Sequence, residues 1–131
     1  MKKIALALVL AAVSGAAMAE WVAISENDET RLYADPTTIR RSGSIVKMWT
    51  LYDLKSPQKN PNKGDAPFLS VKTQKEFDCK EERHRSLYFS HHSGKMGTGK
   101  VVFTNENPIN WSPVPPGSIV GTVWEFACGK Q

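Results

Sequence analysis

Residues 45–54 read IVKMWTLYDL and carry the strongest β-strand signal in this chain of 131 residues. β-Branched and aromatic residues dominate the run, and such residues favour extended backbone in a sheet. Its alternate positions are apolar on both faces: one face holds Ile45, Trp49 and Leu51, and the other holds Val46, Met48 and Tyr52. Because neither face is polar, we predict that this strand runs through the middle of a sheet.

Further strands are predicted on both sides of it. The runs 21–25 and 30–34 flank a polar turn and predict a first hairpin. Other extended runs lie at 68–79, 83–93 and 100–104. The connections between them are too short for helical crossovers, which predicts an antiparallel meander of about six strands.

Two connections are predicted to be irregular. Residues 37–41 follow Asp35-Pro36 and should form one helical turn or a bend, because Pro is tolerated at a first helical position. Residues 56–67 hold three prolines and a glycine among Asn and Lys, which predicts an exposed, mobile loop.

Alternation in residues 68–93 predicts which side chains face the core. Leu69, Val71, Phe77 and Cys79 should point inward from their strand, and Leu87 and Phe89 should do so from the next. The opposite side of the first of these strands should be solvated, and it carries Ser70, Lys72, Gln74, Glu76 and Asp78.

The end of the chain predicts a stiff connector followed by a helix. Residues 107–117 hold four prolines, and Ser118 is a suitable N-cap for a helix that Gly129 ends. Within it, one stripe recurs at helical spacing: Val120, Val123, Trp124 and Ala127. Gly121 weakens the helix by about 1 kcal/mol relative to Ala. The predicted fold class is therefore α+β, a single small antiparallel sheet with a carboxy-terminal helix packed on it.

The two cysteines of the chain, Cys79 and Cys128, are predicted to form one disulfide between this helix and a central strand. An exported protein meets an oxidising compartment, and their spacing does not resemble a C-x-x-C motif. Two free thiols or a catalytic pair are the alternatives. Closing such a long loop should contribute on the order of 4 kcal/mol.

Export is predicted from the first 19 residues. Lys2 and Lys3 precede an apolar run at 4–13, and Ala17-Met18-Ala19 fits a cleavage site, so we predict a signal peptide at 1–19 and one domain at 20–131. A membrane anchor is the alternative, but crossing a bilayer takes about 20 apolar residues. No cysteine follows the cleavage site to carry a lipid, so the mature protein should be periplasmic or secreted, or else associated with the cell surface without a lipid anchor. Losing two lysines leaves 15 basic against 13 acidic residues, too little net charge to suggest nucleic-acid binding.

The sequence offers no recognisable catalytic motif or cofactor site, and we predict a protein that is not an enzyme and needs no cofactor. The glycine-rich residues 93–100 lack the order of a phosphate-binding loop and should form a hairpin loop. On a regular strand, His84 and His92 share a face about 26 Å apart and His91 faces the other way, which disfavours a metal site.

The basic residues of the chain have two interpretations. They form a patch that binds an acidic partner such as a sulfated polysaccharide, or they only keep the strands soluble. The candidates for such a patch are Lys55, Lys59, Lys63, Lys72, Lys75, Arg83 and Arg85.

Several short motifs across the chain resemble the bacterial surface-adhesin protein E family. They are the runs at 33–36, 46–49, 70–72, 77–79, 83–85, 111–118 and 124–128. The resemblance implies a small antiparallel sheet flanked by a carboxy-terminal helix with one disulfide, in an exported protein of a Gram-negative bacterium. A member of the family adheres to host cells and matrix proteins through a lipid-anchored form, whereas this chain lacks the lipid-bearing cysteine. No binding residue can be carried over.

Three functions follow from these observations. The leading hypothesis is an exported, adhesin-like binding protein that engages host matrix proteins or another envelope ligand. The second is a periplasmic accessory protein with a structural or assembly role, and the third is haem or metal capture through His91 or His92. Exposed strand edges would also allow a homodimer.

Overall fold

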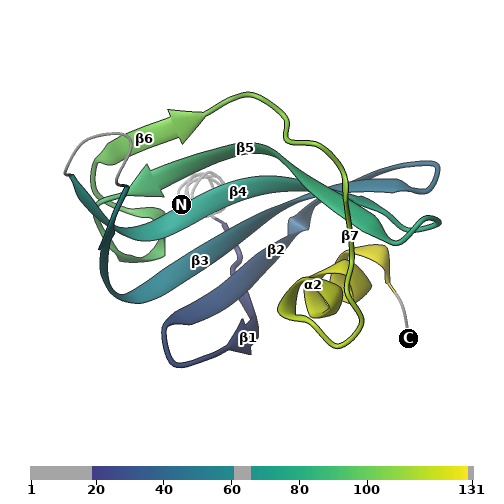
Figure 1. The fold of residues 1–131 in the computed structure, drawn as a ribbon, viewed down its shortest axis with the longest axis horizontal. Helices are drawn as coiled ribbons and strands as arrows, with labels where there is room; N and C mark the ends of the chain where they lie inside the picture. Colours follow the sequence, from purple (N-terminus) through teal and green to yellow (C-terminus); the bar gives the residue numbers. More distant parts are fainter. Residues whose placement is uncertain (1–18, 61–65, 130–131) are drawn as a thin grey trace, which may run out of the picture.

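The computed structural model describes residues 19–60 and 66–129, so the predicted leader, apart from Ala19, lies outside the described residues. The described residues form one antiparallel sheet in the order β1-β2-β3-β4-β5-β6, with β7 paired to β5 (Figure 1). The predicted sheet with a carboxy-terminal helix is thus confirmed. The elements are β1 (Val22–Glu26), β2 (Thr30–Ser42), β3 (Ile45–Lys59), β4 (Pro67–Asp78), β5 (Arg83–His92), η1 (Lys95–Gly97), β6 (Val101–Asn105), β7 (Ser112–Pro113) and α2 (Ile119–Cys128).

The central position of β3 is confirmed. It pairs with β2 on one side and β4 on the other, and Val46 lies opposite both Arg41 and Phe77. Val46, Met48 and Leu51 are fully buried. A strand that buries apolar side chains on both faces anchors its neighbours on either side, as the run at 45–54 predicts.

The helix α2 packs on one face of the sheet and covers only one end of it. We call this whole face the helix face. Residues of β2, β3, β4 and α2 make up the hydrophobic core there: Leu32, Ala34, Val46, Met48, Phe77, Val123, Trp124 and Ala127. The opposite face, which carries Trp49 and Leu51, is called the open face. In Figure 1 the chain after β6 passes along β7 and then enters α2, so the connector brings the helix round the edge of the sheet.

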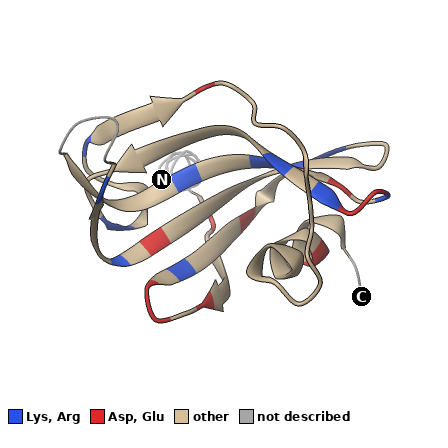
Figure 2. Ribbon diagram, in the orientation of Figure 1, with Lys and Arg blue, Asp and Glu red and all other residues tan. Residues whose placement is uncertain are grey.

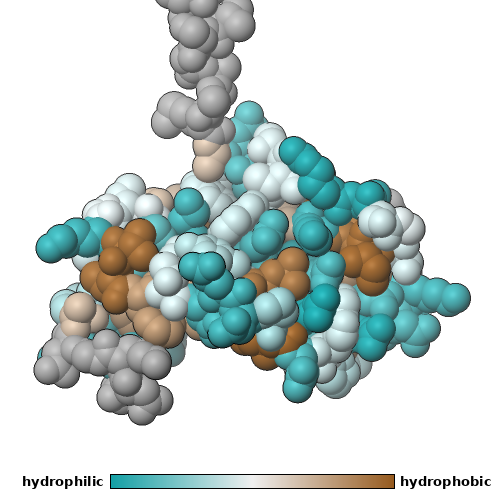
Figure 3. All heavy atoms as spheres, turned by 90° about the horizontal axis from the view of Figure 1, so that it is seen from above, coloured by the Kyte–Doolittle hydropathy of each residue, from teal (hydrophilic) through white to brown (hydrophobic). Residues whose placement is uncertain are grey.

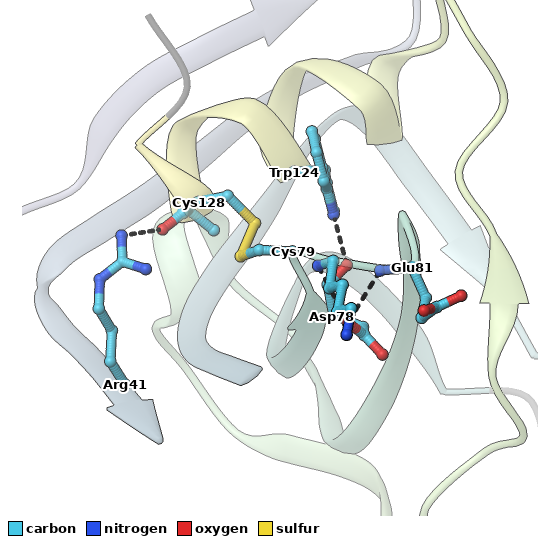
Figure 4. Close-up of a disulfide and its surroundings, with 8 residues drawn as sticks. Arg41, Asp78, Cys79, Glu81, Trp124 and Cys128 are labelled. Atoms are coloured by element: carbon cyan, nitrogen blue, oxygen red, sulfur yellow. Dashed lines mark hydrogen bonds between the residues drawn. A yellow bond between two sulfur atoms is a disulfide. The ribbon is translucent and has the colours of Figure 1, made fainter. Parts of the chain in front are cut away.

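A disulfide and two hydrogen bonds hold α2 in place (Figure 4). Cys79 and Cys128 are bonded with their Cα atoms 5.7 Å apart, which confirms the predicted bridge. The indole Nε1 of Trp124 donates to the carbonyl of Asp78 over 3.0 Å. At the other side, Nη2 of Arg41 donates to the carbonyl of Ala127 over 3.1 Å. The helix is therefore tied to both β4 and β2 near its last turn.

Both ends of α2 have the predicted caps. The hydroxyl of Ser118 accepts from the backbone N–H of Gly121 over 3.0 Å. Gly129 has a φ of 71°, a left-handed conformation that Gly adopts without the strain of a side chain. Gly121 also has a structural reason, because a Cβ there would come within 3.3 Å of the Pro115 carbonyl and the Ser118 hydroxyl. Gly121 lowers the helix propensity, but it allows the proline-rich connector to pack closely on the first turn of the helix.

The helical turn predicted at 37–41 is wrong, because β2 continues through these residues. The ladder slips between Asp35, opposite Trp49, and Arg40, opposite Lys47, so the predicted bend exists as a bulge. Inside the bulge, the hydroxyl of Thr38 accepts from the backbone N–H of Trp49 over 3.0 Å. A side chain thus replaces a backbone carbonyl in the ladder, which satisfies the β3 amide without a helix.

The irregular loop predicted at 56–67 is shorter than expected. β3 runs on to Lys59, and β4 begins at Pro67. Pro57 is tolerated because it lies inside a second register slip, between Asp53 and Gln58, where ladder bonds are already interrupted. Residues 61–65 of the predicted loop lie outside the described part of the chain.

The side-chain alternation predicted for β4 and β5 is only partly confirmed. Phe77 is fully buried in the core, but Leu69 and Val71 are only partly buried, since α2 does not reach their end of the sheet. On the opposite side, predicted to be solvated, the side chains of Ser70, Glu76 and Asp78 are buried. In β5, Leu87 is the extra residue of a bulge and so does not share the regular alternation with Phe89.

We expect the double variant C79A/C128A to lose on the order of 4 kcal/mol of unfolding free energy. The variant lacks the cross-link between two residues 49 positions apart, so its unfolded chain gains conformational entropy. Urea unfolding followed by tryptophan fluorescence measures this loss. Wild-type protein in excess dithiothreitol is the matched control and should behave like the double variant. Equal stability of the oxidised protein and the variant would show that the bridge does not stabilise the fold.

Candidate functional site

An aromatic row crosses the open face at the centre of the sheet. Trp49 on β3, Gln74 on β4 and Tyr88 on β5 lie opposite one another in the ladder. The rings of Trp49 and Tyr88 meet edge to face at 5.7 Å between centroids. Nζ of Lys72 lies 5.8 Å from the Trp49 ring. All four side chains are partly exposed, so the row offers ordered aromatic surface to a partner.

The loop that contains η1 flanks the row on one side, further along the strands. The buried carboxylate of Asp53 accepts from the backbone N–H of Met96 over 2.7 Å and lies 3.5 Å from Nζ of Lys95. The hydroxyl of Ser70 donates to the carbonyl of Gly94 over 2.6 Å and accepts from the N–H of Gly97 over 2.8 Å. These bonds explain why Asp53 and Ser70 are buried on a face without a helix.

Gly97 is required where this loop crosses the sheet. Its φ is 72°, and a Cβ would lie 2.8 Å from Cδ of Lys72. The loop at 93–100 joins β5 to β6, and the N–H of Ser93 donates to the carbonyl of Lys100 over 2.8 Å. The predicted hairpin loop is therefore confirmed, and it forms one wall of the aromatic row.

Trp111 and two arginines flank the row on the opposite side, in the other direction along the strands. The guanidinium carbons of Arg83 and Arg85 each lie 4.7 Å from the centroid of the Trp111 ring. A hollow of about 490 Å³ lies beside them, lined by Glu81, Arg83, Trp111, Ser112 and Pro113. The spacing of the arginines places both on one face, but only the fold brings Trp111 to them from the connector.

Both arginines are paired with buried carboxylates. Nε of Arg83 lies 3.1 Å from Oδ2 of Asp78, and Nε of Arg85 lies 2.7 Å from Oε1 of Glu76. The pKa of Asp78 is lowered, first by the backbone N–H of Glu81 and also by the side chain of Arg83. The positive charge on this side of the row is therefore compensated, and the arginines hold the ring of Trp111 in place.

The basic residues that the sequence suggests as a patch do not form one surface. Lys75 lies on the helix face, 2.8 Å from Nδ1 of His84. Lys55 is paired with Glu26 at 2.7 Å, and Lys63 lies outside the described residues. Figure 2 shows basic and acidic segments interspersed along the ribbon. Of the two interpretations, lysines that keep the strands soluble fit this arrangement better than a site for a polyanion.

The histidine faces are the reverse of those predicted. The bulge at Leu87 shifts the alternation, so His84 and His91 share the helix face and His92 lies on the other. His91 stacks on Phe68 with 4.0 Å between ring centroids, and Nε2 of His92 lies 2.8 Å from the Ser90 hydroxyl. Among the described residues, no three His, Cys, Asp or Glu side chains converge as a metal site would need.

Burial keeps the histidines neutral at neutral pH. The pKa of His84 falls to about 4, first because of burial and also because of the charge of Lys75. Burial also lowers the pKa of Lys75 to about 8. The pKa values of His91 and His92 are lowered, in both cases mainly by burial. The described part of the chain also contains no helix long and apolar enough to cross a membrane.

The model of the surface-adhesin protein E family matches residues 21–129. The chain belongs to the surface-adhesin protein E family. It is thus an adhesin-like surface protein, and family membership supports a non-enzymatic, exported role. No match was found among curated proteins.

Solved structures of Haemophilus influenzae protein E share this fold. One has a TM-score of 0.65 at 13% identity, with 83% of each chain covered. A selenomethionine form has a TM-score of 0.65 at 12% identity, covering 84% of this chain and 86% of that one. A structure from a non-typeable strain has a TM-score of 0.63 at 13% identity, covering 83% and 75%. At such identities the likeness concerns the fold, and individual binding residues do not transfer.

We expect stability to fall as the pH drops from about 6.5 towards 4. In this window unfolded His84 gains a proton that the folded protein, with a pKa of about 4, does not accept, so acid favours unfolding. Because His84 is partly exposed, its share should be on the order of 1 kcal/mol. Urea unfolding at a series of pH values should show a flatter acid slope for His84→Asn than for wild type. Identical slopes would mean that His84 contributes nothing to acid sensitivity.

Proposed function

We propose that this protein is an exported adhesin-like protein that binds a host extracellular-matrix protein through the aromatic row of its open face. The observation that carries the proposal is the family match across residues 21–129, which covers nearly all of the described chain. The row supports it because ordered, partly exposed Trp and Tyr side chains dominate binding energy at protein interfaces.

The chemistry of the row favours a contact driven by stacking and hydrogen bonding. Trp49 and Tyr88 supply aromatic surface, and Gln74 and Lys72 supply polar groups beside them. Nearby charges are largely compensated within the protein, so net charge contributes little to partner choice. Such a site suits a protein surface of mixed polarity better than a strongly acidic polymer.

Other surfaces of the described chain are weaker candidates for a binding site. A hollow of about 540 Å³ between β1 and α2 is lined by Val22, Ala23, Ile24, Thr122, Glu125, Phe126 and Gly129. Phe126 there packs partly against the core, and the lining has no second aromatic ring beside it, unlike the pair of Trp49 and Tyr88. On the face that Figure 3 shows, hydrophobic residues form separate patches among hydrophilic side chains.

Replacing both Trp49 and Tyr88 by Ala should weaken binding to immobilised matrix by at least roughly tenfold, because it removes the aromatic anchors. Biolayer interferometry on solubilised basement-membrane matrix and fibrillar collagen measures this, with circular dichroism as the check on folding. Ile109→Ala is the matched control, since Ile109 is also exposed and apolar but lies on the connector. Absence of wild-type binding at micromolar concentration would rule out matrix adhesion. Full binding by the double variant would show that the aromatic row is not the binding site.

The proposal includes removal of the leader between Ala19 and Glu20. Both residues are exposed and lie outside the strands, so a peptidase could reach the bond. Intact-mass measurement of the exported protein should give a chain that begins at Glu20. Surface proteolysis of whole cells should then degrade it if it acts as an adhesin, whereas protection until the outer membrane is opened would favour the periplasmic accessory role.

A further inference from the structure

The residue next to the expected cleavage site contacts a buried carboxylate. The backbone nitrogen of Glu20 donates to Oδ2 of Asp35 over 3.1 Å. Because Glu20 becomes the amino terminus if the leader is removed after Ala19, this nitrogen would change from an amide to an amine. We propose that signal-peptide cleavage creates an ion pair between the new α-ammonium group of Glu20 and the carboxylate of Asp35, an inference that rests on the cleavage in the proposed function.

Asp35 is a buried carboxylate whose hydrogen-bond donors are all neutral. Asp35 as a whole residue is only 2% exposed. Oδ1 accepts from the backbone N–H of Thr37 over 3.0 Å and from the Thr37 hydroxyl over 2.6 Å. All three donors to Asp35 are neutral, and no Lys or Arg among the described residues forms an ion pair with it. A buried charge that is hydrogen-bonded but has no counter-ion carries a large desolvation cost.

Cleavage would place a positive charge on the backbone nitrogen of Glu20, the atom that already donates to Asp35. Hydrolysis of the bond between Ala19 and Glu20 consumes one water, leaves a carboxylate on Ala19 and releases the amine of Glu20. That amine takes up a proton at neutral pH, since an ordinary α-amino group has a pKa of about 8. A charged donor makes shorter and roughly twice stronger hydrogen bonds to a carboxylate than a neutral amide does.

The ion pair would couple maturation to stability. Before cleavage, Asp35 has only neutral donors, so the precursor should be less stable than the mature protein, which favours folding after export. The pair would also fix the new terminus beside the aromatic row, because Asp35 lies opposite Trp49 in the ladder. The bulge that follows Asp35 positions Thr37 to complete the set of donors.

Two forms released from a cleavable fusion test the pair. One begins at Glu20 and the other retains Ala19, so the two have the same total charge and differ in where the ammonium group lies. We expect the form with Ala19 to melt roughly 5 °C lower. In an Asp35→Asn background the two forms should melt together, and a difference that persisted there would overturn the assignment to Asp35.

A second measurement needs no variant, in case Asp35→Asn does not fold. The Glu20 form is labelled with ¹⁵N-glutamate, and its terminal amine is titrated by NMR. We expect a pKa above the ordinary value of about 8, because the carboxylate stabilises the ammonium form. An ordinary pKa together with equal melting temperatures of the two forms would overturn the ion pair.

The outcomes separate this inference from the proposed function. An exported chain that begins at a residue other than Glu20 would overturn both the cleavage site and the ion pair. A chain that begins at Glu20, but whose two forms melt together and whose terminal amine has an ordinary pKa, would overturn the ion pair alone. Neither result changes the test of matrix binding, which depends on Trp49 and Tyr88.

Discussion

The attachment of α2 to the end of β4 determines which part of the sheet becomes the core. The disulfide at Cys79 and the indole bond from Trp124 to the Asp78 carbonyl hold the helix over Val46 and Phe77. A helix of ten residues is about 15 Å long, so it covers only part of one face. The rest of the sheet must be protected by loops and paired charges, and the centre of the open face stays accessible.

Paired charges and a loop take the place of a second helix on the open face. Asp53 and Ser70 hold the η1 loop over one end, and two arginines hold Trp111 at the other. Because the buried carboxylates at these two ends, Asp53, Glu76 and Asp78, each lie near a Lys or Arg, the surface is polar there without carrying a strong field. Between these two ends, Trp49 and Tyr88 remain partly exposed in a fixed geometry, which is the property that an interaction site needs.

Three register slips account for most differences between the predicted and the observed arrangement. The slip after Asp35 turns an expected helical turn into strand, and the slip after Asp53 carries β3 past Pro57. The slip at Leu87 reverses the faces of the histidines. Each depends on which backbone groups meet across the ladder, so the local alternation of residues contains no sign of it.

Several features were predictable from the residues alone: the central strand at 45–54, the capped helix with its apolar stripe, the disulfide and the family. Propensity, periodicity and cysteine chemistry are local or pairwise properties, which is why they can be recognised without a structure. The candidate site, in contrast, forms only when the chain folds. Folding brings Trp111 onto Arg83 and Arg85, sets Tyr88 against Trp49, and places the nitrogen of Glu20 on Asp35. These contacts join segments distant in sequence, and their geometry follows from strand register and from the path of the connector, which no single stretch of the chain encodes.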